Sequence, residues 1–173
     1  MDYLWAPWRM DYILSPKPQG CIFCEKSAQD CDRENLILWR GKTCFVIMNY
    51  YPYNNGHLMV VPYRHLAHLH ELVAAEQQEM MRALSFCSEI LTAGLKPDGL
   101  NIGMNLGKTA GAGIDDHLHF HIVPRWNGDT NFMPILGETR IIPQYLEETY
   151  DRLRSAFANP LIRRKGQKGG RKR

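Results

Sequence analysis

The stretch Asp116-His-Leu-His-Phe-His-Ile-Val-Pro-Arg-Trp126 decides how the rest of the chain is interpreted. Its histidines fall at positions 117, 119 and 121 and alternate with apolar residues. A period of two is that of a β-strand, so the three imidazoles should share one face of it. Pro124 cannot donate to a sheet ladder, so we expect the strand to end or to become an edge there. A strand with one buried face has no packing reason to carry three imidazoles on the other, so this row is the candidate site.

Three interpretations of the row are open. Histidines at i and i+2 can chelate one zinc ion together with ligands from elsewhere in the chain. A neutral imidazole can instead be a nucleophile that attacks phosphorus while its neighbours orient it or bind the phosphate. In the third interpretation the strand is half exposed and its histidines are only polar residues on the wet side. Strict alternation of three histidines directly after a glycine-rich loop, Leu106 to Gly113, favours the chemical interpretations over the third.

Length and composition are those of an ordinary globular domain. The chain has 173 residues, 45% hydrophobic and 23% charged, which predicts one domain with its own core. No apolar run approaches the ~20 residues that span a bilayer, and the first residues lack the basic and apolar regions of a signal peptide. We therefore expect a cytoplasmic protein without a membrane partner. Five cysteines in such a chain favour metal binding or free thiols over a disulfide framework.

The net charge of +3 is unevenly distributed. Residues 163–173 carry seven positive charges and no negative one, so the rest of the chain has a net charge of −4. We expect an aromatic N-terminal extension over 1–20, a folded domain over 21–158 and a disordered basic tail over 159–173. The tail could make weak contacts with nucleic acid, or it could only keep the protein in solution.

The pair Cys21-Ile-Phe-Cys24 has the spacing of half a tetrahedral zinc site, which we place on a turn. A redox pair would more typically sit at the start of a helix in a thioredoxin-like βαβ unit, and no such pattern follows. The remaining alternative is two packed free thiols.

Hydrophobic patterning predicts the other elements. Strands are expected over 36–39 and 44–48 as a hairpin, over 57–62, and over 99–105. A helix is expected from Leu66 to Leu95 with Gly94 as its stop, and another over 143–157 with Tyr145 on its packed side. We interpret His57 as a structural residue, and His68 and His70 as helix-surface residues.

The segment His117-Leu-His119-Phe-His121-Ile-Val resembles the signature of the histidine-triad (HIT) family, His-φ-His-φ-His-φ-φ with φ apolar. The run Asn49-x-x-Pro-Tyr-Asn-x-Gly-His57, followed by Pro62-Tyr-Arg-His65, resembles the nucleotide-binding half of that family. The opening Trp-Ala-Pro-Trp-Arg is similar to that of the branch that includes diadenosine tetraphosphate phosphorylases. The architecture that follows is α+β: a HIT-like fold with an antiparallel sheet of about five strands and a long helix on one face.

The resemblance implies a role for each matching residue. His119 would attack the α-phosphorus of an adenine-type nucleotide, with His121 and Asn105 stabilising the charge that develops. Ile22 and Phe23 match positions that line the base pocket, and Asn49 matches the residue that binds the ribose. Backbone N–H groups of Gly111 and Gly113 would approach the phosphate. Cys21, Cys24, His65 and His117 would form a closed, structural zinc site.

The resemblance leaves the acceptor open. Related sequences usually offer a serine or threonine just before the triad, where this chain has Ala112-Gly113-Ile114. Phosphorolysis of a dinucleoside polyphosphate is slightly favoured over hydrolysis of phosphoramidates or AMP-like conjugates. A nucleotide-binding regulator and an RNA-associated module, both with little turnover, stay as alternatives of another class. The resemblance also implies a homodimer or higher homo-oligomer.

Overall fold

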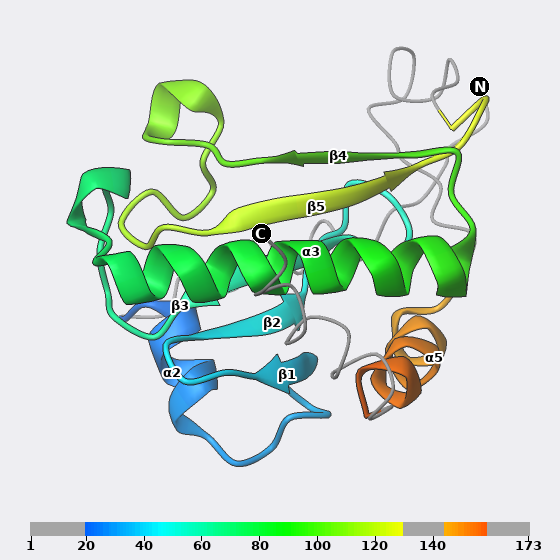
Figure 1. The fold of residues 1–173 in the computed structure, drawn as a ribbon, viewed down its shortest axis with the longest axis horizontal. Helices are drawn as coiled ribbons and strands as arrows, with labels where there is room; N and C mark the ends of the chain where they lie inside the picture. Colours follow the sequence, from blue (N-terminus) through cyan, green and yellow to red (C-terminus); the bar gives the residue numbers. More distant parts are fainter. Residues whose placement is uncertain (1–19, 130–143, 159–173) are drawn as a thin grey trace, which may run out of the picture.

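A computed structural model of the protein describes residues 20–129 and 144–158 (Figure 1). The predicted aromatic extension, apart from Gly20, and the predicted basic tail lie outside the described residues. A single sheet contains β1 (Ile37–Arg40), β2 (Cys44–Met48), β3 (Leu58–Pro62), β4 (Gly99–Gly103) and β5 (Phe120–Arg125). Its strand order is β1-β2-β3-β5-β4, and every neighbouring pair is antiparallel. The predicted five-stranded antiparallel sheet is confirmed.

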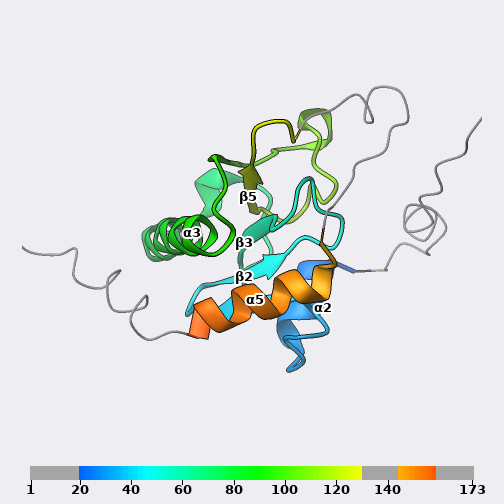
Figure 2. The same ribbon diagram turned by 90° about the vertical axis from the view of Figure 1, so that its right-hand side faces the viewer.

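Within the described residues, three α-helices accompany the sheet. α2 spans Ile22–Ala28, α3 spans Ala74–Leu95 and α5 spans Leu146–Ala158, and two short 3₁₀ turns, η1 (Leu69–Glu71) and η2 (Lys108–Ala110), lie between strands. The long α3 runs along one face of the sheet, and α5 packs against both α3 and β1 (Figures 1 and 2). The predicted α+β architecture with a long helix on one face is therefore confirmed.

The central strands separate two hydrophobic clusters. Alternate residues of β2 enter different clusters: Cys44, Val46 and Met48 join the residues of α3 and α5, whereas Phe45 and Ile47 join Phe23 of α2. All five residues of β2 are buried because both faces of the sheet are covered at this strand. The smaller cluster, on the α2 face, borders the histidine row.

The strand that carries the histidines starts later and ends later than predicted. His117 and His119 precede β5, because the ladders begin at Phe120, opposite Val60, and at His121, opposite Gly103. The strand continues through Pro124, so the prediction that it ends there is wrong. The alternative expectation of an edge is confirmed locally, since the β3 ladder stops at Ile122 and β4 alone pairs with Pro124. A missing N–H is tolerated on the unpaired side of a strand.

The long helix is shorter than predicted at its start. Residues 66–73 form η1 and extended backbone instead, because the Leu66 carbonyl accepts the N–H of Leu118 at 2.7 Å and ties this segment to the histidine row. The helix runs through Gly94 and ends at Leu95, the predicted last residue, and Lys96 after it takes the left-handed conformation (φ 51°) before Pro97. The prediction of Gly94 as the stop was therefore wrong. In α5, Tyr145 precedes the helix and is 77% exposed, contrary to its predicted packed position.

Candidate active site and metal centre

The buried rings of His119, His121 and His57 form a continuous row, and the ring of Phe23 joins this row to the buried ring of His117. The His119 ring lies 4.7 Å from that of His121, and His121 lies 5.0 Å from His57. Phe23 contacts the rings of both His117 and His119, at 5.4 and 5.0 Å. The predicted imidazole row thus exists, although only its last member belongs to β5.

His119 is held in one tautomer. Its Nδ1 lies 2.8 Å from the backbone carbonyl of His117, which can only accept, so Nδ1 carries the proton. Burial lowers the pKa of His119, partly offset by this hydrogen bond, so the ring is neutral near pH 7. A neutral ring with its proton on Nδ1 has its lone pair on Nε2, which is the form that a nucleophile needs.

His57, which the sequence analysis interpreted as a structural residue, is in direct contact with the triad. It is fully buried, and its Nε2 lies 2.9 Å from Nδ1 of His121. Burial and the neighbouring His119 lower the pKa of His121 to about 4. The signal available in the sequence was the position of His57 at the start of a buried strand, which alone does not reveal a partner 64 residues away.

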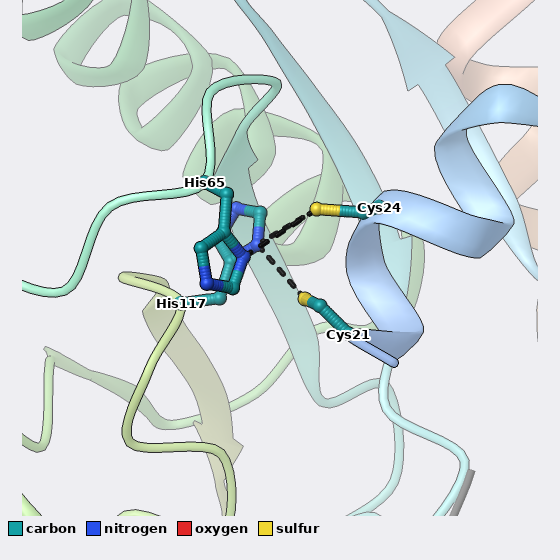
Figure 3. Close-up of side chains that lie close together, drawn as sticks. All are labelled: Cys21, Cys24, His65 and His117. Atoms are coloured by element: carbon teal, nitrogen blue, oxygen red, sulfur yellow. Dashed lines mark hydrogen bonds between the residues drawn. The ribbon is translucent and has the colours of Figure 1, made fainter. Parts of the chain in front are cut away.

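Four side chains come together as a candidate metal centre (Figure 3). The thiols of Cys21 and Cys24 point from α2 toward the imidazoles of His65 and His117. Sγ of Cys21 lies 3.0 Å from Nδ1 of His117, and Sγ of Cys24 lies 3.5 and 3.6 Å from Nδ1 of His65 and of His117. Zinc bonds of ~2.3 Å to sulfur and ~2.0 Å to nitrogen at tetrahedral angles put ligand atoms ~3.5 Å apart. The donor set and its spacing therefore fit one zinc ion.

The ligand histidines are oriented by further contacts. Nε2 of His117 lies 2.9 Å from the carbonyl of Pro62, so it carries the proton and leaves Nδ1 free to face the thiols. Nε2 of His65 lies 3.8 Å from a carboxylate oxygen of Asp116. Burial raises the pKa of Cys24 to about 11, helped by Cys21, so a metal must displace a proton from that thiol on binding.

The sequence analysis placed the Cys-x-x-Cys pair on a turn. The pair lies at the start of α2 instead. Cys21 caps α2 and Cys24 lies in its first turn. A helix start is also where redox pairs occur, so the local geometry does not separate the two uses. The two imidazoles in contact with the thiols do separate them, since they complete a metal-binding set of four.

Both residues between the cysteines pack against the smaller hydrophobic cluster. Phe23 is 2% exposed and packs on His117 and His119, while Ile22 is partly buried against the same cluster. The helix that carries the two thiols thus also supplies a wall of the histidine row.

The glycine loop holds Asn105 close to Gly111. Gly111 has φ +88°, and a Cβ added to it would stand 4.0 Å from Nδ2 of Asn105. The N–H of Gly111 donates to the carbonyl of Lys108 at 2.9 Å, so it is already used within η2. Gly113 lies on the exposed continuation of this loop.

Asn49 makes contacts within its own loop. Its Oδ1 accepts the N–H of Tyr51 at 2.9 Å, and its Nδ2 lies 3.3 Å from Nδ1 of His57. The family resemblance implies a ribose contact for Asn49. In the structure, its contact with His57 connects it to the histidine row.

The sequence model of the HIT domain matches residues 32–128, more than half of the chain. The chain belongs to the HIT family. An AP-4-A phosphorylase of Mycobacterium tuberculosis is 39% identical to this HIT protein over 166 residues, covering 91% of this chain and 85% of that protein. The family match lies inside the predicted 21–158 domain, whose boundaries stay a prediction.

Solved structures agree with the fold of this HIT protein. A zinc-bound histidine triad family protein from Mycobacterium smegmatis has a TM-score of 0.64 at 29% identity, over 80% of this chain and 94% of that one. A hypothetical histidine triad nucleotide-binding protein from Sulfolobus tokodaii has a TM-score of 0.66 at 27% identity, over 87% of this chain and 97% of that one. Within the described residues, no helix is long and apolar enough to cross a bilayer.

Proposed function

We propose that this HIT protein cleaves dinucleoside polyphosphates of the diadenosine tetraphosphate type at the α-phosphorus, through a nucleotidyl-His119 intermediate. The observation that carries the proposal is the neutral, buried His119, whose Nδ1 is bound to a backbone carbonyl and whose Nε2 has the lone pair. The 39% identity to a protein named AP-4-A phosphorylase supports this choice of substrate.

In the first step Nε2 of His119 attacks the α-phosphorus, and the bond from that phosphorus to the bridging oxygen breaks. With diadenosine tetraphosphate the leaving group is ATP, and AMP is bound to His119 through a P–N bond. His121 and Asn105 stabilise the charge on the non-bridging oxygens, together with backbone N–H groups of the glycine loop. Gly113 is a better candidate for that contact than Gly111, whose N–H already has an acceptor.

In the second step an acceptor attacks the same phosphorus and restores His119. Inorganic phosphate would release ADP, and water would release AMP. The relative's name favours phosphate. The absence of a hydroxyl from Ala112-Gly113-Ile114 favours water, which makes hydrolysis of AMP-like conjugates, phosphoramidates included, the second candidate function.

Zinc has a structural part in this proposal. Cys21, Cys24, His65 and His117 would hold it, and a set of four protein ligands leaves no open coordination position. When bound, the ion supplies a fixed junction between α2 and the segment that enters β5. It takes no part in phosphoryl transfer.

A homodimer is the proposed assembly. β4 lies at the edge of the sheet and exposes most of its residues, including Ile102 at 47%. An exposed edge strand offers unpaired backbone groups to a second chain. Sedimentation analysis of the protein and of an Ile102→Lys variant tests this assembly, with a shift of the variant to monomer as the expected result.

Product analysis on diadenosine tetraphosphate, with and without inorganic phosphate, tests the activity. We expect ADP and ATP, formed only when phosphate is present. AMP and ATP formed regardless of phosphate would identify the hydrolase instead. No cleavage of the dinucleotide under either condition would refute the proposed substrate, and adenosine phosphoramidate would be tested next.

A further inference from the structure

The two thiols of the candidate metal centre lie close enough together to react with each other. Cys21 and Cys24 both point at His117 (Figure 3), with Sγ 3.0 and 3.6 Å from its Nδ1. All four ligand atoms of the cluster, the two sulfurs included, lie within 4.8 Å of one another. A disulfide needs a sulfur separation of ~2 Å. Rotation of the two side chains closes the remaining gap, and pairs of this spacing form disulfides in thioredoxin-like proteins.

The helix that carries the pair does not depend on either thiol. Cys21 is the N-cap of α2 and has extended backbone (φ −79°, ψ 116°), and its side chain makes no capping hydrogen bond. The first turn is closed by the backbone alone, since the N–H of Glu25 donates to the carbonyl of Cys21 at 3.0 Å. The two sulfurs can therefore be joined without the loss of a contact that holds the helix.

The pair is also the set of thiols that a small oxidant can reach. Cys21 and Cys24 are partly exposed, whereas two of the other three cysteines, Cys44 and Cys87, are fully buried. Cys31 is partly exposed, but its hydrogen-bond partners are side-chain amides and not a thiol. Oxidation to an internal disulfide is thus expected at Cys21 and Cys24.

We propose that Cys21 and Cys24 are an oxidation site: hydrogen peroxide joins their sulfurs in a disulfide, which empties the metal centre and loosens the segment that holds His119. In the first step one sulfur attacks the peroxide, the O–O bond breaks, and a sulfenic acid forms while hydroxide leaves. In the second step the other sulfur attacks the sulfenic acid, the S–O bond breaks, and a second hydroxide leaves. Two electrons pass from the pair to the peroxide, and each hydroxide takes up a proton to become water.

Oxidation and zinc binding exclude each other at this pair. The thiolate is the form of cysteine that binds a metal, and a sulfur in a disulfide has none to offer. Only His65 and His117 of the four ligands then remain, and a structural zinc site needs four. The start of α2, where both redox pairs and metal ligands occur, would thus have one use in each oxidation state.

The change reaches the histidine row through two contacts. Phe23, between the two cysteines, packs on the ring of His119 with the centroids 5.0 Å apart. The carbonyl of His117 lies 2.8 Å from Nδ1 of His119, and the ring of His117 belongs to the metal cluster. Without the ion, nothing fastens that ring to α2, so both contacts lose their fixed position. This step rests on the proposed function, in which His119 is the nucleophile, whereas the oxidation and the release of zinc do not.

Titration of the zinc-loaded, full-length protein with hydrogen peroxide tests the proposal. Alkylation with mass spectrometry counts the free thiols, and a colorimetric chelator measures the released zinc. We expect two thiols to be lost for each zinc released, and the peptide that contains Cys21 and Cys24 to become lighter by two hydrogens. The Tm should fall as much as it does when a strong chelator is added. Zinc that stays bound while this pair is oxidised, or release with the cysteines as sulfinic or sulfonic acids, overturns the proposal.

Reversal and a matched variant serve as controls. Dithiothreitol with added zinc should restore the thiols, the zinc content and the Tm, whereas oxidised methionines need their own reductases. Cys31→Ser removes the remaining partly exposed thiol and none of the four ligands. We expect this variant to release its zinc at the same peroxide concentrations as the wild-type protein. Zinc retained by Cys31→Ser under these conditions would show that Cys31 is the oxidised residue and would refute the assignment to the pair.

Turnover of diadenosine tetraphosphate tests the link to His119. The oxidised, zinc-free protein should turn over at least ~10-fold more slowly than the reduced, zinc-loaded protein, the usual cost when the groups that orient a site are lost. Dithiothreitol with zinc should restore the rate. Wild-type turnover in the oxidised, zinc-free protein overturns the link. If the reduced protein cleaves no nucleotide, the proposed function fails, while the thiol count and the released zinc still decide the oxidation.

Discussion

At the residue scale, the site depends on which ring nitrogen of each histidine carries a proton. His117 and His119 are only two residues apart, yet backbone carbonyls fix opposite nitrogens: Nε2 of His117 faces Pro62, and Nδ1 of His119 faces the carbonyl of His117. One histidine therefore offers Nδ1 to the thiols, and the other has its lone pair on Nε2. The sequence could predict the row from its period of two, but not these tautomers, because they depend on carbonyls placed by the fold.

Replacing His119 with glycine should abolish turnover and leave a cavity shaped like its ring. We expect kcat to fall by roughly 10⁴-fold or more, since the covalent route is lost with its nucleophile. Added imidazole should restore measurable cleavage of diadenosine tetraphosphate by His119→Gly, through an imidazole adduct of AMP. His121→Gly keeps the nucleophile and should not form this adduct when imidazole is added. Wild-type turnover in His119→Gly without imidazole would contradict the nucleophile assignment.

Acid should destabilise the fold through His121. The folded-state pKa of about 4 is below the ordinary histidine value of about 6.5, so the unfolded chain binds the proton more readily between these values. The stabilisation is complete above pH 6.5 and is lost as the pH falls toward 4. Urea unfolding at pH 7.5 and pH 5 should show a loss larger by about 2 kcal/mol in wild type than in His121→Gln. Equal losses in the two proteins would show that another group accounts for the acid sensitivity.

At the scale of elements, the predictions succeeded where one apolar pattern determines one element. The hairpin of β1 and β2 and the buried strand β3 formed close to where they were predicted. The start of α3 was missed because residues 66–73 are helical in pattern but bind across the fold, through the Leu66 carbonyl and the N–H of Leu118. For Pro124 the sequence left open whether the strand ends or becomes an edge, because sequence does not tell which side of a strand is paired; the structure shows the edge, with β4 alone pairing at Pro124.

The start of α3 should depend on Glu76, a carboxylate that is 4% exposed. Its oxygens accept from Nε and Nη2 of Arg64 at 2.7 and 2.8 Å, and from the N–H of Val73 at 3.0 Å. Glu76→Ala removes the helix-capping contact with Val73 and the ion pair with Arg64, the residue before His65. We therefore expect the unfolding free energy to fall by about 1–3 kcal/mol. Chemical denaturation measures this loss. Gln78→Ala, at an exposed position of the same helix, is the control and should change stability by less than about 0.5 kcal/mol.

At the scale of the whole molecule, the candidate metal centre is built from segments that are distant in sequence. It brings α2, the segment after β3 and the segment before β5 within reach of one ion. Phe23, between the two cysteines, packs on His119. The Cys-x-x-Cys spacing and the triad predicted this connection only together with the family resemblance, because ligands 96 residues apart leave no local pattern.

Removal of the metal should therefore destabilise the fold as a whole. Structural zinc sites contribute ~10 kcal/mol or more of apparent binding free energy. Coupling only ~3 kcal/mol of that to folding would move the Tm by roughly 10 °C in a chain of this size. We expect one zinc per chain by elemental analysis, and a fall in Tm of that order when a strong chelator is added. Cys24→Ser should lose most of the zinc and show the lower Tm without chelator. Cys31→Ser, the same change at a half-buried cysteine outside the cluster, should keep both zinc and Tm. Loss of turnover on chelation with an unchanged Tm would instead assign the metal a catalytic role, because only an ion that holds the fold together lowers the Tm when it is removed.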